Sequence, residues 1–349
     1  MMTDSRLFVS ITGDYPNIGD AFIRRQAVTW VRPAGRATVY ARSAPESWKR
    51  SVGITPEDRE IDSGRFRWLR AILTSRRAPV VAFEPGAIDL DLAALPRELS
   101  FLVMALLVRL RGGTVVLPPR AVAAHHPLTV LVHRLLCRVA TVALWRDKRS
   151  LELVAAGSLS PDIAFDGDAR PGLVPSDRRF LGVSLRGKRQ NVGDEWIGIV
   201  RQFAAANDLE ILTFAQVVDD IERARDLAGR LGGTYSEWVG DDLAQEAELR
   251  ALYDECRCVV SDRLHVLIIS SLSGSVPIEF VPEPTPKVSE TFAIVGYAGM
   301  SESSDRLGDD DALAFLGAQI GRQDELRAAM ERGRSELSSF RDRARARVE

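Results

Sequence analysis

One short segment of the chain brings a serine, an arginine and a histidine together just before an apolar stretch. Ser261 and Asp262 are residue types that cap helices, so we expect Arg263 and His265 in the first turn of the following helix. Backbone amides at a helix start attract anions, and an arginine offers two parallel hydrogen bonds to a carboxylate or phosphate. The segment therefore predicts an anion site. The alternative, a surface pair of Asp262 with Arg263 and a core histidine, stays open.

Three further basic residues lie where strands are expected to end. Arg146 follows an apolar run with only Trp145 between, which predicts that its side chain projects from a strand end into a cleft; the alternative is a solvated arginine at a helix start, paired with Asp147. Arg186 follows the expected strand from Phe180 and opens a basic cluster, which is either a phosphate contact or a solvated charge run. Lys287 lies in a proline-rich loop and by itself is typical of an ordinary surface lysine.

Acidic and amide side chains follow the expected strands of the N-terminal half. The loop after the first strand, GDYPNIGD, contains Asp14, Asn17 and Asp20, and Glu84 follows a later strand. Such groups suit neutral sugar hydroxyls, and Asp20 is a candidate base. The alternative for Asp20 is a capping role at the start of the next helix.

The histidines and cysteines do not form a metal-binding pattern. No second carboxylate or cysteine lies at ligand spacing from His125, His126 and His133, so we interpret them as loop and helix-surface residues. The three cysteines are an odd number without paired zinc-site spacing, which indicates no disulfide framework and a reducing cytoplasm. Cys256 and Cys258 close an apolar helix and are expected to be buried structural thiols.

Composition limits the classes of partner. The 349 residues carry a formal net charge of −2, so no global field draws the protein to nucleic acid or to an anionic membrane. The longest apolar run, 101–108, is far shorter than the roughly 20 residues that span a bilayer, and the first residues do not resemble a signal peptide. No membrane span is expected.

Short apolar runs alternate with longer amphipathic stretches, which predicts an α/β protein with parallel strands. A proline-rich polar stretch near Arg170 interrupts this pattern, and the length favours two domains. The expected parts are an N-terminal domain 1–170, a C-terminal domain 171–321 and a charged helix 322–349.

Four stretches resemble the polysaccharide pyruvyl transferase family in order and spacing, over roughly residues 8 to 300. They are Asn17, Gly19 and Asp20; Arg146, Asp147 and Ser150 followed by Pro161, Asp162 and Phe165; Ser261, Arg263, Leu264 and His265 with Gly274, Pro277 and Ile278; and Lys287. The histidine segment is the most specific of these.

The resemblance implies two Rossmann-like domains that face a cleft, as in GT-B glycosyltransferases, with the C-terminal helix able to cross back. It implies transfer from phosphoenolpyruvate to the hydroxyls of a glycan or lipid-linked oligosaccharide, with release of phosphate and no cofactor or metal. The donor ligands would be Arg146, Arg186, Arg263, His265 and Lys287; the catalytic residues His265, Arg263 and Asp20; and the acceptor ligands Asp14, Asn17, Asp20 and Glu84.

Two stretches depart from the family pattern, both in the half that would bind the acceptor. The segment FEPGAID stands where the family often has a glycine-rich stretch, and Pro118-Pro119-Arg120 stands in place of a Pro-Gln-Ser-like segment. They indicate an unusual acceptor. Two other functions remain open: a nucleotide-sugar glycosyltransferase, which would need a diphosphate cradle, and a non-catalytic homologue that binds an anion.

Overall fold

The computed structural model describes residues 6–61, 64–170 and 177–346, and the chain divides into two compact units. The first unit comprises Met1–Tyr15, Asp20–Asp166 and Ser335–Glu349, and the second comprises Pro16–Gly19 and Gly167–Arg334. The division therefore lies four residues before Arg170. The C-terminal helix is not a part of its own, because its residues are shared between the units.

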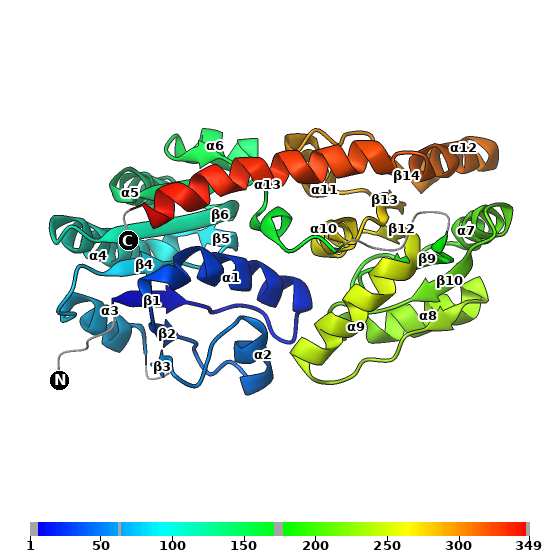
Figure 1. The fold of residues 1–349 in the computed structure, drawn as a ribbon. Helices are drawn as coiled ribbons and strands as arrows, with labels where there is room; N and C mark the ends of the chain where they lie inside the picture. Colours follow the sequence, from blue (N-terminus) through cyan, green and yellow to red (C-terminus); the bar gives the residue numbers. More distant parts are fainter. Residues whose placement is uncertain (1–5, 62–63, 171–176, 347–349) are drawn as a thin grey trace. The chain divides into compact units, whose positions relative to one another are not determined.

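The first unit is built on a parallel sheet (Figure 1). Its strands are β1 (Leu7–Ser10), β2 (Ala37–Tyr40), β3 (Arg59–Glu60), β4 (Val80–Ala82), β5 (Gly86–Leu90), β6 (Thr114–His125), β7 (Val142–Trp145) and β8 (Ser158–Leu159). Their order is β3-β2-β1-β4-β6-β7-β8, with β5 paired to β6. The inner strands are short runs of buried apolar residues, as parallel strands covered on both faces require.

Helices cover both faces of this sheet. They are α1 (Ile18–Val31), α2 (Glu46–Ser51), α3 (Arg65–Leu73), α4 (Leu95–Leu110), α5 (Pro127–Val139) and α6 (Lys148–Val154). The aromatic side chains of Trp68, Phe83 and Trp145 are buried in the core that α3, α4 and α5 share with the strands. Asp147 caps α6 by accepting a hydrogen bond from the amide of Ser150.

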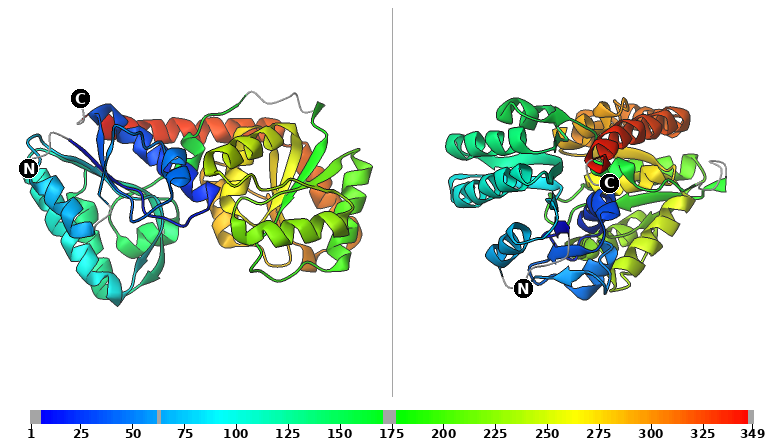
Figure 2. Two further views of the ribbon diagram at one scale, coloured as in Figure 1. Left: turned by 90° about the horizontal axis from the view of Figure 1, so that it is seen from below. Right: turned by 60° about the vertical axis from the view of Figure 1, so that its left-hand side comes forward.

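The second unit repeats this architecture. Its strands are β9 (Phe180–Ser184), β10 (Glu210–Thr213), β11 (Thr234–Tyr235), β12 (Cys256–Ser261), β13 (Val276–Val281) and β14 (Ser301–Ser303), in the order β11-β10-β9-β12-β13-β14. Its helices are α7 (Asp194–Ala206), α8 (Ile221–Leu231), α9 (Asp242–Glu255), α10 (Leu264–Leu272), α11 (Pro286–Ile294) and α12 (Asp309–Ile320). Figure 2 shows helices on both faces of this sheet as well.

The last helix, α13 (Gln323–Arg345), contributes to each unit in turn. In the second unit Arg332 donates to the carbonyl of Val295, and in the first Arg341 forms an ion pair with Asp166. Asp166 also accepts a hydrogen bond from the indole of Trp30. The two-domain parallel α/β fold and the returning C-terminal helix are thereby confirmed.

Each sheet reverses its strand order at one place, between β1 and β4 in the first unit and between β9 and β12 in the second. In open parallel sheets, ligands bind beyond the carboxyl ends of the strands at such a reversal. The loops after these four strands are therefore the places to look for sites.

Several sequence expectations need correction. The apolar run 113–117 predicts a strand that ends before the two prolines, but β6 continues to His125, because the register against β7 shifts between Leu117 and Arg120 and so accommodates them. His133 is not on a helix surface; it is buried and its Nδ1 lies 2.7 Å from Glu98. Cys256 and Cys258 are buried thiols as expected: Cys256 is the C-cap residue of α9, and both cysteines lie on β12.

Within the described ranges, no helix is both long and apolar enough to cross a membrane. The same part of the chain contains no cluster of three or more histidine, cysteine or acidic side chains arranged to hold a metal ion.

Candidate active site

The start of α10 is fixed to the end of β9 by a serine. The hydroxyl of Ser261 donates to the carbonyl of Ser184 at 2.5 Å and accepts from the amide of Arg263 at 3.0 Å. Both bonds lie at the strand-order reversal of the second unit. They tie the backbone that carries Arg263 and His265 to the end of β9.

Arg263 is oriented by a buried carboxylate. Its Nε and Nη2 donate to the two oxygens of Asp220, the Nη2 bond being 2.6 Å, and Asp220 also accepts from the amide of Gly187 at 2.8 Å. The side chain of Asp220 is 1% exposed and that of Arg263 is 19% exposed. The edge of the guanidinium formed by Nε and Nη2 is thus bound to Asp220, and the opposite edge faces solvent. Gly187 cannot be replaced here, because a Cβ would lie 2.3 Å from the carbonyl of Asp219.

The basic loop after β9 is anchored rather than freely solvated. Asp262, almost completely buried, accepts from the amide of Arg186 at 3.0 Å and lies 3.4 Å from the Nε of Arg189. Burial raises the pKa of Asp262, and the nearby Arg186 only partly opposes this. Arg186, Arg189 and Arg263 therefore converge on the end of β12, against two buried carboxylates.

The N-terminal motif loop reaches this cluster. The amide of Ile18 donates to the carbonyl of Gln216 at 3.1 Å, and a Cβ on Gly19 would lie 2.7 Å from the Cβ of His265. Only a glycine lets the backbone approach so closely. Gly19 and His265 both belong to the second unit. The loop and the histidine segment therefore form one local structure, although they are about 245 residues apart in sequence.

Lys287 lies at the start of α11 and is exposed. A hollow of about 560 Å³ lies beside it, beyond the carboxyl ends of β13 and β14, and its lining includes Thr285, Ser301 and Arg306. Arg189 connects the basic loop to this hollow by donating to the carbonyl of Glu283 at 3.0 Å.

Arg146 has a different setting from the other candidate cations. It belongs to the first unit, is 3% exposed and donates to Asp162 at 2.6 Å. The amide of Arg146 also donates to the carbonyl of Arg120. The structure therefore presents Arg146 as a buried ion-pair partner.

The carboxylates of the N-terminal loop are tied to an arginine. Asp20 lies within the first turn of α1, accepts from the amide of Asp14 at 2.9 Å and forms an ion pair with Arg24 at 3.0 Å. It is not the helix cap, because α1 begins two residues earlier. Asp14 is exposed, and Asn17 belongs to the second unit through its bridge to Val217.

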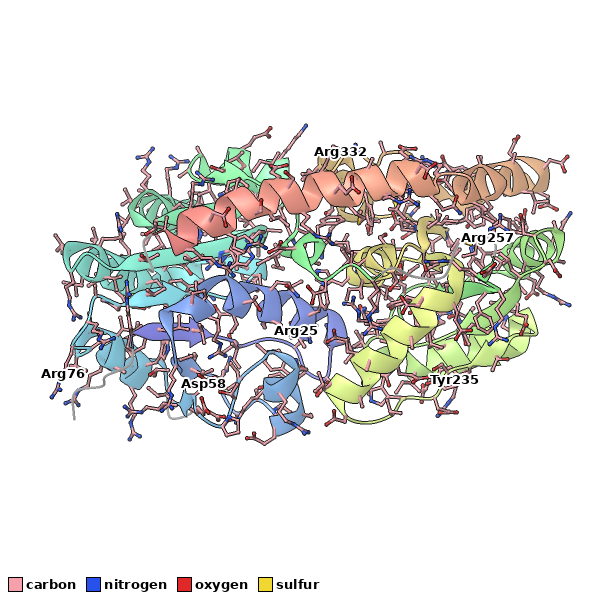
Figure 3. All side chains as sticks on the ribbon, viewed as in Figure 1. Arg25, Asp58, Arg76, Tyr235, Arg257 and Arg332 are labelled. Atoms are coloured by element: carbon pink, nitrogen blue, oxygen red, sulfur yellow. The ribbon has the colours of Figure 1, made fainter. Side chains whose placement is uncertain are left out.

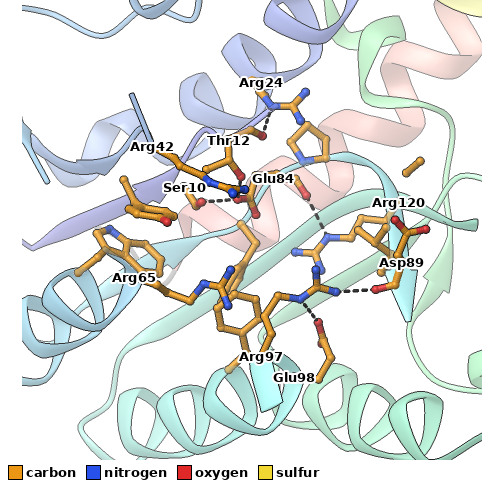
Figure 4. Close-up of a pocket in the computed structure, with 17 residues that line it drawn as sticks. Ser10, Thr12, Arg24, Arg42, Arg65, Glu84, Asp89, Arg97, Glu98 and Arg120 are labelled. Carbon is orange, nitrogen blue, oxygen red and sulfur yellow. Dashed lines mark hydrogen bonds and ion pairs between the residues drawn. The ribbon is translucent and has the colours of Figure 1, made fainter. Parts of the chain in front are cut away.

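Glu84 lies in a separate pocket of the first unit, of about 230 Å³ (Figure 4). It accepts hydrogen bonds from the hydroxyls of Ser10 and Thr12, the latter at 2.6 Å. Burial opposes its charge, but these hydroxyls and the charge of Arg120 prevail and hold the pKa of Glu84 below its usual value. Glu84 is therefore an ionised hydrogen-bond acceptor at the reversal of strand order between β1 and β4.

The sequence did not reveal several residues of these two sites. Asp220 lies in a charged stretch that carries no sign of its pairing with Arg263, and Gln216 follows no motif. Arg24, Arg42, Arg65, Arg97 and Arg120 all line the Glu84 pocket, although they come from distant parts of the chain.

A family model described as polysaccharide pyruvyl transferase matches residues 17–275. The matched range begins at the loop that packs on His265 and includes the whole of α10. The chain belongs to the polysaccharide pyruvyl transferase family. Within this family member, the two stretches that depart from the family pattern supply much of the lining of the Glu84 pocket: Phe83, Glu84, Pro85, Ala87, Ile88 and Asp89 from one, and Arg120 from the other.

Solved structures with a similar fold include HepE (Alr3699) of Anabaena in complex with UDP and glucose, at 10% identity and a TM-score of 0.52 over 97% of this chain and 98% of that one. MurG of Acinetobacter baumannii is similar at 13% identity and a TM-score of 0.51, over 97% and 99% of the two chains. At these identities the likeness establishes the GT-B fold. A search of curated proteins returned no match for this family member.

Proposed function

We propose that the protein transfers a pyruvyl group from phosphoenolpyruvate to two hydroxyls of a glycan, forming a ketal and releasing phosphate. The observation that carries this proposal is the packing of the Asn17–Gly19 loop against His265, beside Arg263. This packing supports the proposal because it brings two of the segments that resemble family motifs into contact within the second unit.

The donor carries a carboxylate and a phosphate a few ångströms apart, and removing both from water requires fixed cations. Arg186, Arg263 and Lys287 lie at or near the carboxyl ends of β9, β12 and β13. Arg263 is held by Asp220 at its inner edge, so its exposed edge is the part available to the donor. We leave Arg146 out of the donor set, since its guanidinium is enclosed with Asp162.

The chemistry runs in two additions to one carbon. A proton is added to the donor methylene, which becomes the methyl group, and a glycan hydroxyl loses its proton and bonds to the central carbon. Phosphate then leaves with the electrons of its C–O bond, and a second hydroxyl of the same sugar bonds to that carbon and loses its proton. Fixed guanidinium groups stabilise the charge that develops on the phosphate and carboxylate.

His265 is the titratable side chain of the motif, and we assign it one of two roles: a hydrogen bond to the donor phosphate, or delivery of the proton to the methylene. His265→Gln separates them, because glutamine keeps a donor group but cannot transfer a proton. A loss confined to kcat, with donor binding retained, identifies proton delivery. A matching loss of donor affinity identifies the phosphate contact.

The acceptor belongs to the first unit in this proposal. Glu84, with Ser10 and Thr12, lines a pocket at the strand-order reversal, and hydrogen bonds of this kind hold sugar hydroxyls. Asp20 supports this pocket through its pair with Arg24, which lines it.

The test is phosphate release from phosphoenolpyruvate, measured with and without a panel of glycan acceptors. We expect release only when a suitable acceptor is present, and a large loss in Arg263→Lys. Release of a nucleoside diphosphate from a nucleotide sugar, with phosphoenolpyruvate inert, would replace this proposal by glycosyl transfer.

A further inference from the structure

The Glu84 pocket contains more positive charge than a site for a neutral sugar needs. Five arginines line it against three carboxylates, Glu84, Asp89 and Glu98 (Figure 4). The arginines are Arg24, Arg42, Arg65, Arg97 and Arg120. A cavity of about 230 Å³ is smaller than the roughly 300–1,000 Å³ of sites for drug-sized ligands, so a single sugar-sized group fits it.

Arg120 is the buried cation of this pocket. It is 4% exposed, its Nε donates to the carbonyl of Glu84 at 3.0 Å, and its Nη2 has no hydrogen-bond partner among the described residues. An unsatisfied buried donor costs about 1–3 kcal/mol, and more when it is charged. An acidic group of a ligand would remove this cost.

Arg42 and Arg65 also lack acidic partners within the described ranges. Arg65 lies over the ring of Phe101, with its guanidinium carbon 5.4 Å from the ring centre, and Figure 4 shows it beside Arg97 at the cavity. Arg42 has a left-handed backbone with φ of 46°, which is uncommon for a residue with a side chain, and its carbonyl accepts from the hydroxyl of Tyr15. The guanidinium groups of Arg42 and Arg65 can therefore each form an ion pair with an acidic ligand.

We propose that this pocket binds a negatively charged saccharide, so that the acceptor of the reaction carries a phosphate or a carboxylate on or next to the sugar it presents. The identification of this saccharide as the acceptor rests on the proposed function. The binding of an acidic saccharide to the pocket does not depend on it. The basis of the inference is the excess of guanidinium groups in the pocket at the strand-order reversal of the first unit.

Calorimetric titration without donor tests the proposal with three probes: N-acetylglucosamine 1-phosphate, glucuronic acid and N-acetylglucosamine. We expect at least one acidic probe to bind tenfold or more tightly than the neutral sugar, and the tighter of the two identifies phosphate or carboxylate as the charged group. Equal affinity for the neutral sugar, or no binding of either acid, would overturn the proposal.

Arg42→Gln and Arg65→Gln should each lower the affinity for the acidic probe about tenfold and leave the affinity for the neutral sugar unchanged. The matched control is Arg70→Gln, an exposed position on the same helix as Arg65 that does not line the pocket. Phosphoenolpyruvate should neither compete with the acidic probe nor lose affinity in these variants. Competition would mean that the pocket is a donor site. Binding of the acidic probe by a protein that shows no pyruvyl transfer would contradict the proposed function and leave the inference about the pocket standing.

A second inference rests on a different observation, the exposed apolar side chains of α3, α4 and α5. Helix α4 packs against both α3 and α5, so the three form one layer of the first unit. Phe66 is 84% exposed and Leu110 82% exposed. The same layer exposes Leu73, Leu99, Val103, Leu106, Leu107, Leu128, Leu131 and Leu135. An apolar groove lies between α3 and α4.

This apolar face is strongly basic around its edges. Outside the lining of the Glu84 pocket, residues 65–139 contain eight arginines and one acidic residue, in a chain whose net charge is −2. Arg67, Arg70, Arg76, Arg77, Arg111 and Arg138 are exposed, and Figure 3 shows Arg76 pointing away from the unit. Apolar side chains surrounded by arginines are typical of surfaces that lie on anionic lipid.

We infer that this face docks on an anionic membrane surface. Cosedimentation with vesicles provides the test, using phosphatidylcholine alone and phosphatidylcholine mixed with phosphatidylglycerol. The protein should bind the mixed vesicles, salt should weaken the binding, and Phe66→Ser with Leu110→Ser should remove most of it. The control is Val239→Ser, an exposed apolar residue of the second unit. No binding to the mixed vesicles, or a dimer in light scattering that the double variant dissociates, would overturn the inference.

Discussion

Gly19 and His265 are in direct backbone-to-side-chain contact: a Cβ on the glycine would lie 2.7 Å from the Cβ of the histidine and 3.0 Å from its Nδ1. Residues from the start and the end of the matched family range therefore depend on each other. The loop that carries Gly19 therefore limits where the side chain of His265 can lie.

Gly19→Ala should disturb the site more than the fold. The added methyl group must displace His265 or Gln216, so we expect kcat to fall at least tenfold and the unfolding free energy to fall by about 1–3 kcal/mol. The control is Gly198→Ala in α7, where a Cβ meets nothing within 4 Å. That change should stabilise the helix by up to about 1 kcal/mol and leave kcat unaltered. Unchanged kcat in Gly19→Ala would mean that His265 does not act in the reaction.

Arg263→Lys should damage catalysis while the protein stays folded. Lysine keeps the charge but loses the fork that binds both oxygens of Asp220 while facing the donor. Bonds to charged groups are worth about 1.5–3 kcal/mol, so we expect a loss of roughly 10- to 150-fold in kcat/KM for phosphoenolpyruvate. Arg201→Lys, at an exposed position of α7, serves as the control. Near-normal turnover in Arg263→Lys would show that the two parallel hydrogen bonds of the Arg263 guanidinium are not needed for the reaction.

Much of the fold could be predicted from the sequence because buried parallel strands are short apolar runs between amphipathic helices. From those runs the two-domain α/β architecture could be predicted. The length of β6 could not be predicted, because two adjacent prolines normally end a strand and only the register shift against β7 accommodates them.

The site was only partly predictable for a related reason. Arg263 and His265 lie in one local segment with a recognisable pattern. Asp220 and the five arginines of the Glu84 pocket are brought together by tertiary packing, which leaves no spacing in the sequence. Arg146 was expected in the cleft from its place after a strand, but its burial with Asp162 depends on a residue in a later loop.

Phosphoenolpyruvate should raise the melting temperature, whereas UDP should not. The stabilisation is RT ln(1 + [L]/Kd), about 2.7 kcal/mol at a hundred times Kd. Differential scanning fluorimetry over a range of ligand concentrations measures it, and inorganic phosphate at the same ionic strength is the control. Stabilisation by UDP alone would favour a nucleotide-sugar substrate.

Acid should destabilise the first unit through Asp58 (Figure 3). Burial opposes its charge, but Arg32, at 2.8 Å, and the amides of Thr55 and Ala37 hold its pKa below the usual 3.8. A carboxyl with a lowered folded-state pKa stabilises the fold above its unfolded-state pKa and loses that contribution as pH falls through the folded-state pKa.

Asp58→Asn should therefore cost about 1–3 kcal/mol at pH 7 and flatten the loss of stability below about pH 4. Urea unfolding at a series of pH values measures both effects, with the exposed Glu248→Gln as the control. A variant as acid-sensitive as the original protein would show that Asp58 does not contribute to this transition.

The central claim is ketal formation from phosphoenolpyruvate, and NMR of the glycan product made in D2O tests it most directly. The account predicts a new ketal methyl group on the acceptor, carrying one deuterium from solvent, with one phosphate released for each ketal. Phosphate release without a ketal, or an acceptor altered only by a sugar from a nucleotide donor, would contradict it.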